Sequence, residues 1–243
     1  VPADSIDADG NIKIGYVGAY PYDEVVSGYT GFYLGVKSIV SNVAMSVTYT
    51  NSWYDPTVEA EAANSLISQG CIIISQHADS TGSPSACEAA LAAGTPIYCV
   101  GYNIDMLSVA PTSALTSAQN NWDVYYTYAL GQAVKGEAID TDWASGYAEG
   151  AVQISALGDS CAEGTADKVA EVEAALIDGS LNVFDTASFT VGGETITSTP
   201  VFDTDGDWVK DSGEAIVDGV FEESVQRSAP YFGLRIDGIT ELN

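Results

Sequence analysis

Four segments of the chain share one pattern, in which a short apolar run ends at a polar or aromatic bend and an amphipathic stretch follows. The apolar runs are residues 12–18, 46–50, 71–75 and 96–101. Strands that alternate with helices in this way predict an α/β fold, a parallel sheet with helices on both faces. In open sheets of this type, ligands bind beyond the carboxyl ends of the strands. The bends after the four runs are therefore where we expect a binding site.

The alternation is regular over residues 12–105 and predicts a β-α-β-α-β-α-β unit with right-handed crossovers. We expect a ligand-binding lobe at 12–111. Residues 112–243 are expected to cross over and form the C-terminal part of another lobe. Hairpins are expected at about 183–218, where Thr, Gly and Asp are frequent. This second part lacks the alternation needed for an independent sheet, so the strands it should pair with are expected to lie outside this sequence.

The charge of the chain excludes several partners. It has 7 Lys and Arg against 34 Asp and Glu, a formal net charge of -27. Such a field repels phosphate backbones and anionic lipids, so we expect no nucleic-acid partner. The acids are scattered, in pairs at most, which favours a solubilising surface over an acidic tail. No apolar run approaches the roughly 20 residues that span a bilayer.

The bends combine flat aromatic faces with directional polar groups. A planar, neutral ligand that forms hydrogen bonds, such as a nucleobase, would suit this combination. Each aromatic residue taken singly is better explained by ordinary packing, and the shared placement after strands is what favours a site. The predicted ligand-binding residues are Tyr20, Tyr22, Trp53, Tyr54, His77, Asp79, Tyr102, Asn103, Asp105 and Trp122.

Catalysis has little support in the sequence. His77 is the single histidine, so a Ser/His/Asp system would need it together with Asp79 and either Ser75 or Ser80. The chain has no Gly-x-Ser-x-Gly elbow, and neighbours in sequence do not form a triad geometry. Phosphate-binding glycine motifs are also lacking. We therefore predict no enzyme activity and no nucleotide cofactor.

One acidic stretch near the C-terminus has spacing similar to that of a calcium loop. Its sixth position is Trp208, where the sharp turn of such a loop needs glycine. A solvated hairpin that turns at Asp205-Gly206 is the favoured alternative. The residues that would hold Ca²⁺ are Asp203, Asp205, Asp207, Asp211 and Glu214. No other cofactor is expected.

The cysteines Cys71, Cys87, Cys99 and Cys161 allow three disulfide pairings, and none has the close spacing of a zinc or redox site. Buried free thiols are the favoured interpretation, because Cys71 and Cys99 fall in expected strands and Cys87 in an expected helix. A disulfide framework remains the alternative.

Several short strings occur in an order and spacing that resemble one known family. They lie at 13–18, 51–56, 76–80, 101–106 and 121–122, within a likeness that holds over roughly residues 12–150. The chain resembles the basic membrane protein (BMP) family of ABC-transporter substrate-binding lipoproteins, a group that includes purine-nucleoside receptors. The resemblance implies a type I periplasmic-binding-protein fold, with one complete lobe here and the C-terminal part of another.

The resemblance also implies a function. It indicates a non-enzymatic receptor that binds a small solute, a purine base or nucleoside, and delivers it to an ABC permease. The full-length form would be extracytoplasmic, at the cell surface or in the periplasm, and lipid-anchored. By position, Trp53, His77, Asp79, Tyr102 and Asn103 would face the cleft, together with Asp105. Asn103 stands where relatives often carry an Asp that holds a ribose.

The family begins with a lobe segment that this sequence lacks. We therefore expect a partner that covers the open edge, either the N-terminal fragment or another copy of the chain. The alternative function from another class is a structural or assembly role, in which the shortened chain pairs with a second polypeptide.

Overall fold

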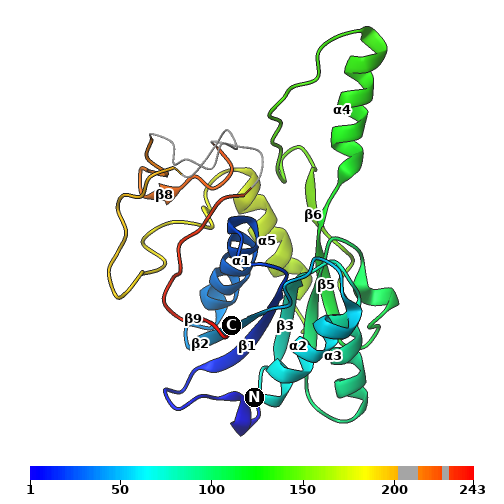
Figure 1. Ribbon diagram of the computed structural model, residues 1–243, viewed down its shortest axis with the longest axis vertical. Helices are drawn as coiled ribbons and strands as arrows, with labels where there is room; N and C mark the ends of the chain where they lie inside the picture. Colours follow the sequence, from blue (N-terminus) through cyan, green and yellow to red (C-terminus); the bar gives the residue numbers. More distant parts are fainter. Residues whose placement is uncertain (202–212, 226–229) are drawn as a thin grey trace.

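The computed structural model describes residues 1–201, 213–225 and 230–243 (Figure 1). Within these ranges a seven-stranded sheet has the order β6-β5-β4-β3-β1-β2-β9. All neighbours are parallel except β6, which is antiparallel to β5. The predicted α/β class is confirmed. The strands are β1 (Ile12–Gly18), β2 (Val43–Tyr49), β3 (Ile73–His77), β4 (Tyr98–Tyr102), β5 (Ala114–Asn120), β6 (Val152–Ile154) and β9 (Ile239–Glu241).

Helices cover both faces of this sheet, with α1 and α5 on one side and α2 and α3 on the other (Figure 1). Their bounds are α1 (Asp23–Ile39), α2 (Pro56–Ser68), α3 (Gly82–Ala92), α4 (Trp122–Lys135) and α5 (Thr165–Ile177), with short 3₁₀ turns η1 (Ala3–Ser5) and η2 (Met106–Ser108). Asp55 followed by Pro56 is a favourable start for α2. The Asp55 carboxylate accepts hydrogen bonds from the amides of Thr57 and Val58, both at 3.1 Å, and Pro56 occupies the first turn.

Two apolar cores lie on opposite faces because side chains alternate along each strand. Ile14 and Tyr16 of β1 pack into the first core with α1, β2 and C-terminal residues such as Phe232. Val17 packs into the second core with α2, α3, β3 and β4. Because β1 has a core on each side, it is a central strand of the sheet, and its apolar character follows from burial on both faces.

The structure differs from the expected division at residue 111. β5 continues the sheet beside β4, and β9 pairs with β2, so both ends of the 112–243 segment belong to the same sheet as β1–β4. The Glu241 carboxylate on β9 accepts hydrogen bonds from the Tyr29 and Tyr49 hydroxyls, both at 2.7 Å, and from Arg235 Nε at 2.9 Å. These bonds fix the C-terminal strand against α1 and β2. The assignment of further residues to a second lobe stays a prediction.

The region expected to form hairpins contains short antiparallel pairs. β7 (Ile216–Val217) and β8 (Val220–Phe221) form one, and Val191 bridges Glu194 across Gly192-Gly193. The Asp205-Gly206 turn and the acids Asp203, Asp205, Asp207 and Asp211 of the calcium loop lie outside the described residues. Glu214 is described, and its carboxylate accepts hydrogen bonds from the amides of Thr199 and Ile216 at 2.6 and 3.0 Å. Calcium binding stays a prediction.

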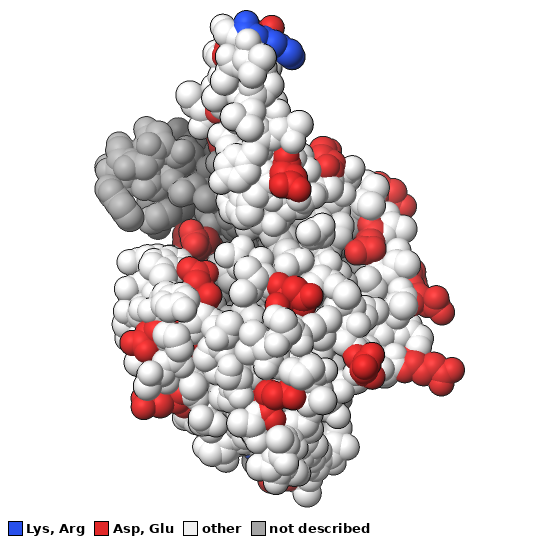
Figure 2. Space-filling model, turned by 90° about the vertical axis from the view of Figure 1, so that its right-hand side faces the viewer, with Lys and Arg blue, Asp and Glu red and all other residues white. Residues whose placement is uncertain are grey.

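Helix α4 projects away from the sheet (Figure 1), and none of its residues is buried. Trp122, Tyr126, Leu130 and Val134 recur every four residues along it, so they share one face, and all four are exposed. Figure 2 shows acidic side chains scattered over one side of the molecule and basic ones at the tip of this projection. The α4 face is therefore an exposed apolar stripe on a helix that packs against no core.

Candidate functional site

Five aromatic rings form a continuous row at the carboxyl ends of β1–β4. We call this set the ring row: Tyr20, Tyr22, Trp53, His77 and Tyr102. The rings of Tyr20 and Tyr22 are stacked with centroids 5.1 Å apart, and Trp53 lies 5.5 Å from Tyr20. Trp53 is 6.5 Å from His77, which is 4.2 Å from Tyr102. The structure thus places half of the predicted ligand-binding residues in one connected group.

Strand register explains why these bends meet. Gly18 at the end of β1 pairs with Tyr49 of β2 and with His77 of β3, so the three strands end at the same level. The bends after β2 and β4 each use an asparagine with positive φ, 55° at Asn51 and 68° at Asn103. Asparagine tolerates this left-handed conformation better than most residues. The chain can therefore turn sharply at the strand ends and present the rings along one edge.

His77 is the most buried member of the ring row, with 8% of its surface exposed. Burial lowers its pKa to about 4, so the imidazole is neutral at physiological pH. Its Nδ1 has no hydrogen-bond partner among the described residues. A Cβ added at Gly28 would lie 2.6 Å from this atom, so the absence of a side chain on α1 makes room for the ring. A neutral imidazole offers one donor and one acceptor.

The bend after β3 is tied to the bend after β2. The Asp79 amide donates to the Trp53 carbonyl oxygen at 2.7 Å. The Gln76 side chain donates to the carbonyl oxygens of Ala78 and Ser80, at 2.6 and 3.0 Å. These contacts leave Asp79 exposed beside the ring row. Asn103 follows Tyr102, and the backbone amide of Asn103 donates to the Ala118 carbonyl oxygen at 2.7 Å.

Besides Asp79 and Asn103, three predicted residues lie outside the ring row. Tyr54 is exposed, and Asp105 accepts a hydrogen bond from the Leu107 amide at 2.9 Å, which caps η2. Trp122 starts α4, where its ring lies 6.2 Å from Tyr126. Their contact with a ligand stays a prediction.

Sequence reasoning missed two residues beneath the site. The Tyr16 hydroxyl and His77 Nδ1 both lie against Gly28. A Cβ added at Gly28 would be 3.1 Å from the Tyr16 hydroxyl oxygen. Glu59 is buried below the bends after β2 and β3. Its position four residues after the N-cap Asp55 is the one signal that could have indicated a role at the start of α2.

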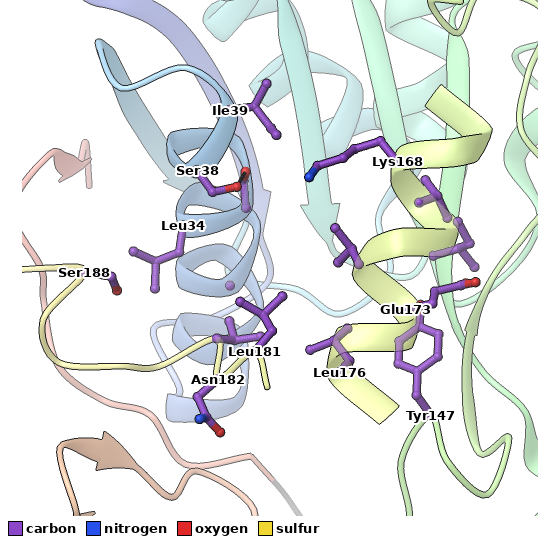
Figure 3. A pocket seen from close by; sticks show the side chains of 16 residues that line it. Leu34, Ser38, Ile39, Tyr147, Lys168, Glu173, Leu176, Leu181, Asn182 and Ser188 are labelled. Carbon is purple, nitrogen blue, oxygen red and sulfur yellow. Dashed lines mark hydrogen bonds between the residues drawn. The ribbon is translucent and has the colours of Figure 1, made fainter. Parts of the chain in front are cut away.

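A groove of about 450 Å³ lies elsewhere, between α1 and α5 (Figure 3). Leu34 and Ile39 of α1 face Val172 and Leu176 of α5 across it. These α1 residues belong to the C-terminal half of the helix, whereas the ring row lies next to its start. The groove is therefore separate from the predicted site.

Metal and thiol chemistry have limited support. In the part of the chain that the structure describes, no group of three or more His, Cys, Asp and Glu could hold a metal ion. Cys71, Cys87 and Cys99 are buried free thiols, and Cys161 is a half-buried free thiol. Burial raises the pKa of Cys71 to about 11, so this thiol is unreactive at neutral pH. No helix in the described ranges is long and apolar enough to cross a membrane.

A mostly parallel sheet with aromatic and polar side chains along its carboxyl edge has the arrangement of an open α/β ligand-binding fold. Solved structures agree on the fold. An ABC-transporter solute-binding protein from Aeropyrum pernix aligns with a TM-score of 0.59, at 19% identity, over 80% of this chain and 59% of that one. One from Conexibacter woesei aligns with a TM-score of 0.57, at 19% identity, over 74% and 59%.

The family follows from the sequence comparison. The model described as "ABC transporter substrate-binding protein PnrA-like" (Bmp) matches residues 10–185, and the chain belongs to this family. A purine-binding protein of Brucella abortus is 35% identical over 70% of this chain and 47% of its own length. A putative ABC transporter glucose-binding protein of Haloferax volcanii is 32% identical over 74% and 44%. The chain thus spans about half the length of these relatives.

Proposed function

We propose that the chain is the solute-binding component of an ABC transporter and that its solute is a purine base or nucleoside. The observation that carries this proposal is the ring row, which ends at a buried, neutral His77 on the carboxyl edge of the sheet. Membership in a substrate-binding family supports the transport role. The name of the Brucella abortus relative supports the purine.

The geometry suits a flat heterocycle. A purine can stack on the indole of Trp53 or on a tyrosine ring. The neutral imidazole of His77 and the side-chain amide of Asn103 each offer a donor and an acceptor to the edge of the purine. The carboxylate of Asp79 adds an acceptor beside Trp53, to which its backbone is bonded. Since ligand pockets combine apolar walls with a few directed polar groups, this edge has the composition of a wall for a small planar solute.

The test is isothermal titration of the chain with adenine, adenosine, guanosine, inosine and glucose. Glucose is included because of the Haloferax volcanii relative. We expect saturable heat with one of the purines. Heat with glucose alone would overturn the purine assignment and keep a solute-binding role, while heat with none of the five would contradict the proposed function.

Trp53→Ala should weaken purine binding by on the order of 1–3 kcal/mol, as loss of base–aromatic stacking does. This corresponds to roughly 5-fold to 150-fold in Kd. Titration of both proteins with the best purine measures the change. Trp143→Ala is the matched control, because Trp143 packs against Tyr125 and Tyr128 and not against the ring row. Equal affinity of Trp53→Ala and the unmodified chain would contradict the stacking role.

The remaining partners follow from the same proposal. The working receptor would deliver its solute to an ABC permease, outside the cytoplasm, and its complete form would carry a lipid anchor. The relatives are about twice as long as the matched region. We also propose that a second copy of this chain covers the apolar stripe of α4.

The stripe can be tested directly. Apolar faces of this kind promote association, so we expect light scattering to show concentration-dependent association of the 25.3 kDa chain. The double substitution Leu130→Gln and Val134→Gln should reduce it. Ile39→Gln, which removes an exposed apolar side chain from α1, is the control and should have little effect. A stable monomer at all concentrations would count against covering by a second copy.

A further inference from the structure

A buried carboxylate lies directly below the site. Glu59 is in the first turn of α2, and none of its surface is exposed. Its Oε1 accepts hydrogen bonds from the amides of Asp55, at 3.2 Å, and Ser80, at 3.3 Å. Asp55 ends the bend that carries Trp53, and Ser80 directly follows Asp79. One oxygen atom therefore joins the two bends.

The link to the bend after β3 is separate from helix capping. The Asp55 side chain caps α2 through the amides of Thr57 and Val58, and the Glu59 carboxylate completes this cap by accepting from the amide of the N-cap residue Asp55. The bond that Glu59 accepts from the Ser80 amide has no part in the cap and reaches the bend that carries Asp79. The bond from the Asp79 amide to the Trp53 carbonyl oxygen, at 2.7 Å, is a second connection between the same two bends.

The location of Glu59 is costly for a charged group. Burial raises its pKa, the Asp79 carboxylate raises it further, and hydrogen bonds from Ser80 and Asp55 oppose both effects. Its Oε2 has no hydrogen-bond partner among the described residues. Removing a carboxylate from water without full pairing opposes folding. An apolar side chain of similar size would fill the space without this cost, so the bonds that Oε1 accepts are what the carboxylate adds.

We propose that Glu59 is a positioning residue of the solute site, which holds the Trp53 bend and the Asp79 bend in fixed register through its two backbone hydrogen bonds. The indole face of Trp53 and the Asp79 carboxylate can then contact the same ligand. This inference rests on the proposed function for the identity of the ligand. The fixed arrangement of the two bends does not depend on a bound ligand.

The experiment uses the full chain labelled with 5-fluorotryptophan and ¹⁹F NMR. The chain has four tryptophans, and Trp53→Phe identifies the signal of Trp53. Three variants are compared: Glu59→Ala, Glu59→Met, which removes the acceptor with little loss of volume, and Glu59→Gln, which keeps an acceptor oxygen. The control is Glu61→Ala, an exposed carboxylate two residues further along α2.

In Glu59→Met and Glu59→Ala we expect the Trp53 signal to shift or broaden while the Trp143 signal stays in place. Glu59→Gln and Glu61→Ala should leave both unchanged. Titration with the best purine should show about tenfold weaker binding for Glu59→Met and near-normal binding for Glu59→Gln. An unmoved Trp53 signal in Glu59→Met would overturn the inference, even if thermal unfolding showed lower stability. Because the NMR comparison needs no ligand, failure of purine binding alone would reject the proposed function and not this inference.

Discussion

Between pH 7 and pH 5 the chain should lose about 2 kcal/mol more of its unfolding free energy than the variant His77→Phe. The cause is the burial of His77, which lowers its pKa from 6.5 to about 4 in the folded chain. In the unfolded chain the imidazole takes up a proton as the pH falls through 6.5. The folded chain takes it up only near pH 4. The unfolded state therefore binds more protons in this window, and the unfolding free energy decreases as the pH is lowered.

Urea denaturation at pH 7, 6 and 5 measures the effect. The range stops at pH 5 because the sequence pI is about 4.1, where low net charge promotes precipitation. Carboxylates such as Glu59 and Asp79 titrate in both proteins, so the difference between the two curves isolates His77. His77→Gln is a second reference that keeps a polar side chain. Parallel curves for all three proteins would show that the imidazole is already protonated in the fold or that it is accessible to water.

Gly82→Ala should destabilise the chain by about 3 kcal/mol. Gly82 is the first residue of α3, where the helix crosses the start of α2. A Cβ at this position would lie 2.3 Å from the Pro56 carbonyl oxygen and 3.0 Å from Cβ of Glu59. The nearest atom belongs to the backbone of α2. The clash with an alanine Cβ can therefore be removed only if α2 and α3 move apart below the ring row.

Gly131→Ala is the matched control for Gly82→Ala. Gly131 lies inside α4, and a Cβ there would meet nothing within 4 Å. Alanine favours a helix interior over glycine by up to about 1 kcal/mol, so this variant should be neutral or slightly more stable. Urea denaturation at pH 7 compares the two. Equal stability of Gly82→Ala and the unmodified chain would contradict the close contact of α2 and α3.

The sheet could be predicted from the sequence because its central strands are buried on both faces. The apolar runs at β1 and β3 have few polar residues to interrupt them, and turn residues mark their ends. The capping signal at Asp55-Pro56 fixed the start of α2. Short edge strands lack such signals. β6 and β9 are three residues long, and the place of β9 depends on Tyr29 and Tyr49, which are remote in sequence from Glu241.

The ring row could be predicted for a related reason. Residues that follow neighbouring parallel strands meet at one edge, so position in sequence was enough for Tyr20, Trp53, His77 and Tyr102. Trp122 follows β5 by the same rule, but its ring lies against Tyr126 of α4, a helix that projects away from the sheet. Glu59 was missed because a glutamate in the first turn of a helix is usually solvated. Its burial depends on how α3 packs over it.

The most direct test of a purine site at the carboxyl edge is the NMR signal of the imidazole. The sequence contains one histidine, so the imidazole spectrum reports on the ring row alone. During titration with the purine that gives the largest heat, the His77 resonances should shift and saturate at the concentrations at which the heat saturates. In Trp53→Ala they should saturate only at concentrations about 5-fold to 150-fold higher, in line with its weaker binding. Saturating heat with unmoved His77 resonances would show that the solute binds elsewhere and would contradict the proposed site.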